Sequence, residues 1–348
     1  MGLRNVFKEL FMKQRRVLII NTGGTIGMKK TEKGYAPARN YLAKAISELA
    51  DMKKENAPEW ELYELPRLLD SSDISVKEWN EIAEIIYSQY DSYDGFVVLH
   101  GTDTMAYTAS ALSFILDGLD KPVILTGSQI PLSEIRSDGK DNLVTSMLIA
   151  ADAVAREVCL YFSGKLLRGN RAVKMSADDL VAFDSPNYPH LADVGISIKY
   201  NLSAIGNFGK SELSLRPFSS VPIGVLKVFP GIQFGLFESI MTEKLSGIVL
   251  ETFGAGNIPS DGGSLIPIIS RAFESGSVVA VCSQCPSGTV SLGAYETSSH
   301  LKNAGAVSGM DMTTEAAVAK LYYLFSLGIS KKEIKAKMEE NLRGELTK

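Results

Sequence analysis

Short apolar runs alternate along the first half of the chain with longer segments whose apolar residues recur at helical spacing. The clearest run is Phe96–Leu99, and a continuous β-branched and aliphatic run of this kind is typical of a strand buried on both faces. Similar runs predict strands at 16–21, 61–65, 122–125 and 158–162. Helical spacing predicts helices at 41–50, 76–90, 105–116 and 141–155. Because strands alternate with helices, the pattern predicts a parallel sheet.

The same alternation resumes in the last third of the chain. It predicts strands at 223–228, 247–250 and 278–282, and helices at 235–241, 263–274, 314–326 and after Ser330. The residues before it lose periodicity and gain Gly, Ser and Pro, which indicates a linker. We therefore expect an α/β protein with a parallel-sheet-based, flavodoxin-like N-terminal domain and a smaller α/β C-terminal domain. The expected divisions are a basic tail at 1–15, the N-terminal domain at 16–200, the linker at 201–221 and the C-terminal domain at 222–348.

Three predicted strands end in turns that contain glycine and hydroxyl side chains. These turns are 21–25 (NTGGT), 100–104 (HGTDT) and 126–129 (TGSQ). In an open α/β sheet, ligands bind at the carboxyl ends of the parallel strands, so we expect the turns to converge on one site. Taken alone, the second turn fits a helix start capped by Asp103 better than a functional site. The segment 22–37 that follows the first strand is predicted to be a long loop without regular structure, of the kind that usually carries function.

Composition narrows the class of protein. The formal net charge is −4, and nucleic-acid binding proteins usually carry a basic footprint instead. No apolar run is long enough to span a membrane. The three cysteines suit a reducing cytosol better than a disulfide framework. Cys282 and Cys285 are spaced like half a zinc site but have no second pair, so we predict no metal and no cofactor, and we expect His100 to be a hydrogen-bonded structural residue.

Common catalytic motifs are absent. The sequence contains no Walker A motif, no G-x-G-x-x-G after the first strand, no G-x-S-x-G elbow and no H-E-x-x-H. What remains is the set of hydroxyl-bearing turns.

Residues 21–27 (NTGGTIG) and 100–104 (HGTDT) together resemble the paired signature of bacterial-type L-asparaginases, and are most similar to the cytosolic type I branch. Further matches lie at 70–72, 126–129, 168–171, Lys174 and 341–346. The resemblance runs from about Arg16 to the C-terminus. It implies a cytoplasmic enzyme that hydrolyses L-asparagine to L-aspartate and ammonia without a cofactor.

The resemblance also implies catalytic roles. Thr25 would be the nucleophile that attacks the side-chain amide, and Tyr35 on the same loop would position its hydroxyl. Thr102, Asp103 and Lys174 would form a second, fixed triad. A threonine needs such help because its hydroxyl is a poor nucleophile at neutral pH. Which threonine attacks first stays open at this point.

The implied substrate-binding residues surround a zwitterion. Ser71 and the backbone at Ser72 would bind the α-carboxylate, Asp103 would bind the α-ammonium, and the Thr102 N–H with a group near Ser128 would face the oxyanion. The full implied set is Gly24, Asp70, Ser71, Ser72, Thr102, Asp103, Ser128 and Asn257. Because Asn257 matches a position that reaches a neighbouring subunit's site, the resemblance implies a homodimer or homotetramer.

Two positions depart from effector-regulated relatives. Val173 and Glu251 stand where we expect a threonine and a basic residue, so we predict that control by a second asparagine is absent or altered. Three alternatives stay open: a glutaminase-asparaginase, the asparaginase-like subunit of a tRNA-dependent amidotransferase, and a non-catalytic amino-acid sensor.

Overall fold

The computed structural model describes residues 15–32, 34–206, 211–259, 264–293 and 296–347. The predicted basic tail, apart from Arg15, therefore lies outside the described residues, as does 207–210 of the predicted linker. The domain limits stay predictions.

The N-terminal part is built on an eight-stranded sheet in the order β13-β12-β9-β8-β7-β5-β1-β4. Five strands run parallel, namely β4 (Glu59–Leu69), β1 (Arg16–Gly23), β5 (Gly95–Leu99), β7 (Val123–Thr126) and β8 (Val158–Phe162). Counted along the chain, their spatial order is 2-1-3-4-5, which is the flavodoxin-like order. Antiparallel pairing then adds β9 (Lys165–Arg168), β12 (Ala192–Val194) and β13 (Ile198–Tyr200). The predicted fold class is confirmed.

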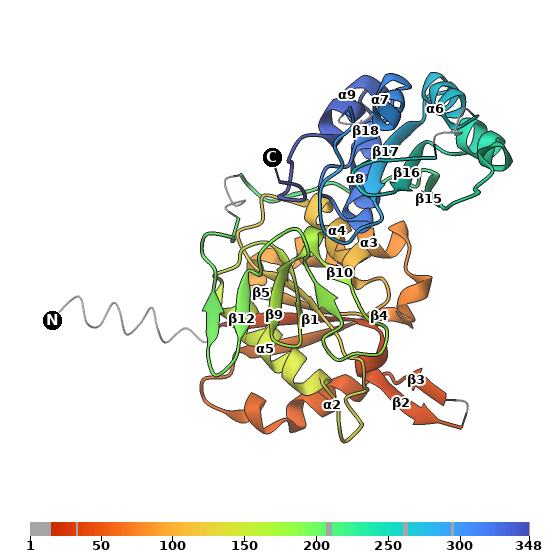
Figure 1. Cartoon of the computed structure of the whole chain (residues 1–348). Coiled ribbons are helices and arrows are strands. Elements are labelled where there is room, and N and C mark those ends of the chain that lie inside the picture. The colour runs from red at the N-terminus through yellow and green to blue at the C-terminus, as the bar shows by residue number, and fades with distance from the viewer. Residues whose placement is uncertain (1–14, 33, 207–210, 260–263, 294–295, 348) are drawn as a thin grey trace.

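Alternation along β1 explains why helices cover both faces of this sheet. Leu18 and Ile20 pack with helices α3 (Val76–Ser88) and α4 (Met105–Ile115). Val17 and Ile19 pack with helices α2 (Tyr41–Glu48) and α5 (Gly139–Asp152) on the opposite face. All four β1 side chains are buried, as the two-sided apolar pattern predicts. Figure 1 shows α3 and α4 on the side of the sheet that faces the C-terminal part.

The C-terminal part holds a parallel four-stranded sheet of β15 (Ile223–Lys227), β16 (Gly247–Thr252), β17 (Val278–Ser283) and β18 (Val307–Ser308). Its helices are α6 (Leu265–Glu274), α7 (Glu296–Asn303), α8 (Thr314–Ser326) and α9 (Lys331–Met338). Helix α8 packs against α4, where the rings of Phe114 and Tyr323 stack with centroids 5.5 Å apart. Helix α4 therefore joins the two parts of the core (Figure 1).

Shorter elements complete the chain. They are β2 (Met28–Thr31), β3 (Gly34–Pro37), β6 (Leu116–Asp117), β10 (Val173–Lys174), β11 (Phe183–Asp184) and β14 (Ser214–Leu215). The single-turn helices are η1 (Thr25–Gly27), η2 (Ala50–Lys53), η3 (Ser71–Asp73), η4 (Tyr90–Ser92), η5 (Gly169–Arg171), η6 (Phe234–Phe237) and η7 (Ile240–Lys244). Capping boxes at Ser75 with Glu78 and at Ser330 with Glu333 begin α3 and α9.

Two predictions of local structure are wrong. The segment 22–37 is not irregular, because it forms η1 and then pairs β2 with β3 as an antiparallel hairpin. The predicted α-helix at 235–241 is a 3-10 turn followed by a π-turn, η6 and η7. Within η6 and η7, Phe234 and Met241 reach the core, whereas Leu236 and Ile240 are exposed, so the apolar positions do not share one helical face. Helix α7 and strand β18 lacked a clear pattern and were not predicted.

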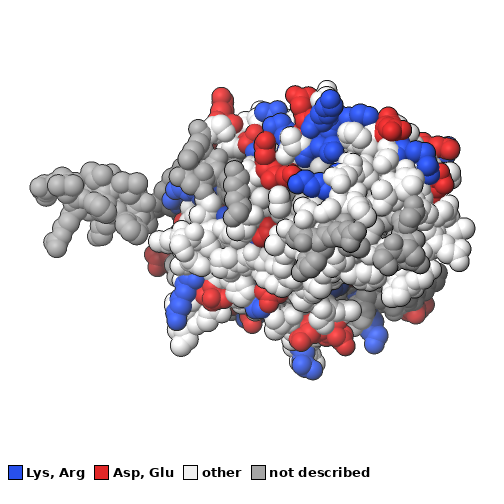
Figure 2. All heavy atoms as spheres, turned by 45° about the horizontal axis from the view of Figure 1, so that its top comes forward, with Lys and Arg blue, Asp and Glu red and all other residues white. Residues whose placement is uncertain are grey.

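On the face in Figure 2, acidic and basic side chains are interspersed and separated by uncharged residues. Within the described part of the chain, no helix is both long enough and apolar enough to cross a membrane.

Candidate active site

The turns after β1, β4 and β5 touch one another, as the repeated pattern predicts. Gly24 has φ +79°, and a Cβ built on it would lie 2.4 Å from the Gly101 nitrogen. A Cβ on Gly101 would in turn lie 2.5 Å from the Ser71 hydroxyl. Both positions need glycine because the backbone at each packs directly against an adjacent turn and leaves no room for a Cβ atom. This contact lies at the carboxyl ends of β1 and β5, where the strand order reverses and where open α/β sheets bind ligands.

The turn after β7 joins the same group. A Cβ on Gly127 would meet the His100 carbonyl oxygen at 2.3 Å, and Ser128 and Ile26 both pack against Gly139. Ser128 is buried, and its hydroxyl has no hydrogen-bond partner among the described residues. Four strand ends therefore surround one position. The turns that follow these strands carry the predicted residues Gly24, Thr25, Ser71, Thr102 and Ser128.

Lys174 reaches this position from β10, which pairs with β11 through Lys174 and Phe183. Its Nζ donates to Thr102 Oγ1 at 2.9 Å and to Asp103 Oδ1 at 2.6 Å. The Thr102 hydroxyl donates to Gln129 Oε1 at 3.1 Å, so its oxygen faces the ammonium group and its proton faces Gln129. The Asp103 side chain is 67% exposed, which leaves the carboxylate accessible to a ligand.

The alternative in which Asp103 caps a helix is wrong. Helix α4 begins after Thr104, which makes no side-chain cap bond and donates instead to the Ser71 carbonyl oxygen at 2.7 Å. The Asp103 carboxylate is therefore available to pair with Lys174. The hydrogen bond from Thr104 also ties the Ser71 turn to the start of α4.

Asp70 and Ser72 serve the turn that contains Ser71. The Asp70 carboxylate accepts hydrogen bonds from the backbone N–H and the hydroxyl of Ser72, both at 2.9 Å. These bonds lower the pKa of Asp70. Both donors of Ser72 are therefore engaged within the turn, while Ser71 stays buried against Gly101.

Thr25 and Tyr35 lie on the segment that was expected to be irregular. Thr25 is half-buried at the start of η1, one residue after the contact between Gly24 and Gly101. Tyr35 is 48% exposed on β3, and its hydrogen bond with Glu134 raises its pKa. The described structure contains no hydrogen bond between the Thr25 and Tyr35 side chains, so the predicted contact is not formed in this conformation.

Asn257 lies in the C-terminal part and closes a tight turn. Its backbone N–H donates to the Phe253 carbonyl at 2.8 Å and its carbonyl accepts from the Phe253 N–H at 3.0 Å. Gly256 permits this turn with φ +116°. The role of Asn257 at a neighbouring subunit's site stays a prediction.

His100 is structural, as predicted. Its Nδ1 donates to the Gly101 carbonyl at 2.7 Å, and its Nε2 accepts from the Thr108 hydroxyl at 2.8 Å. The Gly101 carbonyl can only accept, so the neutral ring carries its proton on Nδ1 and its Nε2 accepts. Thr108 also accepts from Trp79 Nε1 at 3.0 Å. Complete burial lowers the pKa of His100 to about 4, so the ring is neutral near pH 7.

Gln129 is a residue of the site that was not predicted. Its Oε1 receives the Thr102 proton, and its Nε2 donates to the carbonyls of Ala177 and Asp179. It thus links Thr102 to the segment that follows Lys174. The only signal was its place in the turn after β7.

Val173 and Glu251 line one cavity of about 320 Å³, together with Lys174. Glu251 accepts a hydrogen bond from the Thr314 hydroxyl at 2.6 Å. Cys285 also lines this cavity, whereas burial raises the pKa of Cys282 to about 12. The residues that the structure describes include no group of three or more His, Cys, Asp or Glu side chains that could hold a metal ion.

Comparison with known proteins gives matches over nearly the whole chain. The asparaginase N-terminal family model matches residues 16–206, and the glutaminase/asparaginase C-terminal domain model matches residues 222–338. The chain is 43% identical to L-asparaginase 1 of Escherichia coli over 336 residues, which is 97% of this chain and 99% of the relative.

Solved structures agree with this match. The crystal structure of L-asparaginase I from Vibrio cholerae has a TM-score of 0.89 at 42% identity, and covers 96% of this chain and 100% of its own. The thermostable L-asparaginase from Thermococcus kodakarensis has a TM-score of 0.87 at 32% identity, with 96% and 99% covered.

Proposed function

This chain belongs to the asparaginase family and is a hydrolase of amide C–N bonds, and we propose that it converts L-asparagine to L-aspartate and ammonia. The observation that carries the proposal is the bonding of Lys174 to both Thr102 and Asp103, beside the turn that presents Thr25. The group combines two hydroxyls, a cation and an accessible carboxylate. A zwitterionic substrate with an amide side chain matches these groups.

In the proposed reaction, the Thr25 hydroxyl oxygen attacks the side-chain amide carbon. The C–N bond breaks, ammonia leaves with the hydroxyl proton, and an ester to Thr25 remains. Water then hydrolyses the ester, which releases aspartate and regenerates the hydroxyl. Thr102 and Lys174 pass protons, with Gln129 holding the Thr102 hydroxyl in its orientation.

Lys174 accepts a proton only in its neutral form. In the ligand-free geometry, Lys174 Nζ lies 2.6 Å from Asp103 Oδ1 and forms an ion pair with it. A substrate ammonium that binds Asp103 would weaken this hold, because the carboxylate would then be shared by two cations. We infer that substrate binding weakens the ion pair between Lys174 and Asp103.

Substrate contacts would come from the surrounding turns. The Ser71 hydroxyl would bind the α-carboxylate. The Ser72 N–H and hydroxyl, which both donate to Asp70 in this structure, would be shared with the same carboxylate. The Thr102 N–H and a backbone group near Ser128 would face the oxyanion. Preference for asparagine over glutamine would rest on one methylene, which typically gives about 10–200-fold discrimination.

The test is ammonia release from L-asparagine and L-glutamine over a wide concentration range. Thr25→Ala and Thr102→Val should each lose at least about 10²-fold activity, by analogy with the loss of other catalytic groups. Thr242→Ala is a matched control, because that hydroxyl donates only to the Glu238 carbonyl of its own turn. Full activity in both site variants would refute the two-threonine site, and a silent wild type that binds asparagine would indicate a sensor.

We further propose a cytoplasmic homodimer or homotetramer in which Asn257 reaches the neighbouring subunit's site. All three cysteines are unpaired, which fits a reducing compartment. Sedimentation and activity measured over the same dilution series should show that activity falls as the oligomer dissociates. Full activity of a monomer would exclude a shared site.

We propose that control by a second asparagine is absent or altered. A carboxylate-bearing effector in the cavity beside Lys174 would meet Glu251, whose charge repels it, and Val173, which offers no hydrogen bond. The dependence of rate on asparagine concentration should be hyperbolic, and a sigmoidal curve would contradict this proposal.

A further inference from the structure

The hydroxyl of Thr102 has a partner that fixes the direction of its proton. Gln129 Nε2 donates to the carbonyl oxygens of Ala177 at 3.3 Å and of Asp179 at 3.0 Å. Because a carbonyl oxygen can only accept, these two bonds settle which end of the Gln129 amide is nitrogen, and Oε1 faces Thr102. Oε1 can also only accept, so the Thr102 hydroxyl gives its proton to Gln129 across 3.1 Å.

Lys174 occupies a second bonding position of the same oxygen. Its Nζ lies 2.9 Å from Thr102 Oγ1, and a lysine ammonium group only donates. A hydroxyl has one donor position and two acceptor lone pairs. With its proton directed at Gln129 and one lone pair bonded to Lys174, Thr102 keeps a single lone pair. The hydroxyl can therefore accept a hydrogen bond from a ligand but cannot donate one.

Gln129 is held at its backbone as well as at its side chain. Its N–H lies 3.0 Å and 3.2 Å from the two carboxylate oxygens of Asp138. Asn142, which is buried, donates from Nδ2 to Asp138 at 3.1 Å and to the Gly127 carbonyl at 3.0 Å. The turn that carries Gln129 is thus fixed from α5, and its acceptor is in place before a ligand arrives.

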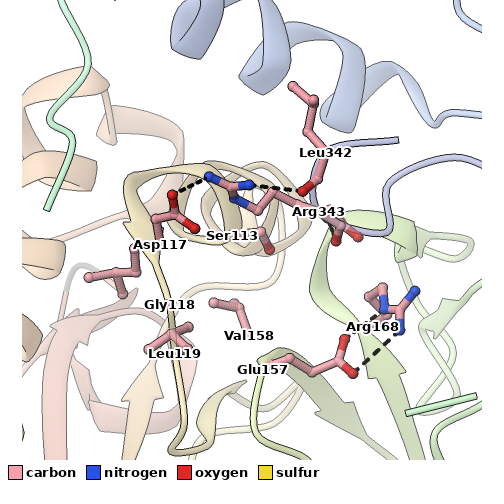
Figure 3. Close-up of a pocket in the computed structure, with 11 residues that line it drawn as sticks. Ser113, Asp117, Gly118, Leu119, Glu157, Val158, Arg168, Leu342 and Arg343 are labelled. Carbon is pink, nitrogen blue, oxygen red and sulfur yellow. Dashed lines mark hydrogen bonds and ion pairs between the residues drawn. The ribbon is translucent and has the colours of Figure 1, made fainter. Parts of the chain in front are cut away.

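The segment that leads to Lys174 is anchored in a comparable way. Figure 3 shows Arg168, at the end of β9, paired with Glu157, and the Nε–Oε2 distance is 2.6 Å. Both side chains are almost fully buried. Two residues later, Asn170 Nδ2 donates to the Arg343 carbonyl at 2.9 Å. Both partners of the Thr102 hydroxyl therefore belong to well-bonded segments.

We propose that Gln129 is a specificity-determining residue, which makes the site select the amide group of the substrate over the carboxylate group of the product. The inference rests on the proposed function, in which Thr102 acts on the reacting group of asparagine. An amide N–H can donate to the remaining lone pair of Thr102, whereas a carboxylate can only accept and meets no proton there. Such hydrogen-bond mismatches discriminate between ligands more strongly than one methylene does.

Weak binding of the product follows from this arrangement. When the amide nitrogen has left as ammonia, the new side-chain carboxylate of aspartate faces a lone pair of Thr102. Lys174 attracts the same carboxylate, but this attraction does not require Gln129. A Gln129 variant therefore separates the orientation of the hydroxyl from the charge of the site.

The test measures binding without turnover, by calorimetry of Thr25→Ala protein with L-asparagine and with L-aspartate. Adding Gln129→Met removes the acceptor and frees the Thr102 proton to turn toward the ligand. We expect the ratio of the two dissociation constants to shift at least about 10-fold in favour of aspartate. Gln284→Met is the matched control, because Gln284 Nε2 also donates to two carbonyl oxygens, and neither belongs to the predicted site. This control should leave the ratio unchanged.

A second background shows whether Gln129 acts through Thr102. When Thr25→Ala protein also carries Thr102→Val, no hydroxyl remains to be oriented, so Gln129→Met should change the ratio by less than about 2-fold. An equal shift in both backgrounds, or an unchanged ratio in the first, would overturn the inference and leave the proposed function standing. Failure of Thr25→Ala protein to bind either amino acid would contradict both.

A further measurement needs no variant. Neutron diffraction from crystals of the ligand-free wild type, exchanged into D₂O, should place the Thr102 deuteron on the line to Gln129 Oε1. A deuteron directed away from Gln129 would overturn the inference, whatever the folding of the variants.

Discussion

Replacing Lys174 with methionine separates a catalytic role from a structural one. The substitution keeps an unbranched side chain but removes the ammonium group, which bonds to Thr102 at 2.9 Å and to Asp103 at 2.6 Å. Both lost bonds lie within the proposed site. The question is whether activity falls by more than the loss of folding free energy can account for.

The structure sets the expected cost in stability. The Asp103 partner is 67% exposed, and exposed ion pairs contribute about 0–1 kcal/mol. The hydrogen bond to the Thr102 hydroxyl contributes about 1 kcal/mol more. The free energy of unfolding should therefore fall by at most about 2 kcal/mol, which leaves the protein folded at 25 °C if its stability is in the usual range of about 5–15 kcal/mol.

The expected kinetic loss is larger. Removing a group that transfers protons in the transition state typically costs about 10²–10⁴-fold in rate. That loss corresponds to about 3–5 kcal/mol in the activation barrier. Because the variant stays folded, the rate measures chemistry and not the population of native protein.

The assay is ammonia release at saturating asparagine, with urea unfolding of the same samples. Lys165→Met is the matched control, because Lys165 pairs with Asp184 at 2.7 Å outside the site. We expect a similar stability loss in both variants and a large rate loss in Lys174→Met alone. If Lys174→Met kept a tenth of wild-type activity, or if both variants lost activity equally, the catalytic role of Lys174 would be refuted.

Three further predictions concern stability. Gly24→Ala should abolish activity and lower the free energy of unfolding by more than about 2 kcal/mol, because the positive φ alone costs about 1–2 kcal/mol and the added Cβ would clash with Gly101. Gly34→Ala has open space around it, so in urea unfolding it should lower this free energy by less, and it should leave activity unchanged. Lys320→Met should lower the free energy of unfolding by about 3–5 kcal/mol, because it leaves Glu345 charged and fully buried. A double variant that also carries Glu345→Gln should recover part of this loss. Calorimetry that shows no loss of stability in Lys320→Met would contradict the prediction. Because the pKa of His100 falls from 6.5 to about 4 on folding, the unfolded chain binds its proton first as the pH drops, so this residue should remove up to about 3 kcal/mol of stability between pH 6.5 and pH 4. The difference between wild type and His100→Gln should show this slope, and parallel pH curves for the two proteins would refute it.

Periodicity in the sequence was enough to predict most of the scaffold. The strand at 158–162 and the helix at 314–326 occur at the predicted bounds, and a helix follows Ser330 as predicted. These elements depend on local spacing and on caps, which a single segment contains. The hairpin at 28–37 was missed because its two strands are mostly exposed and have no apolar alternation to indicate them.

The sequence by itself also determined the residue types at the strand ends and hence the kind of chemistry that they allow. Only the tertiary structure decided which groups meet: Lys174 reaches Thr102 across 72 positions, Gln129 takes the Thr102 proton, and Ser72 gives its donors to Asp70. Such contacts depend on side-chain direction and on packing between distant segments, which spacing along a chain does not encode.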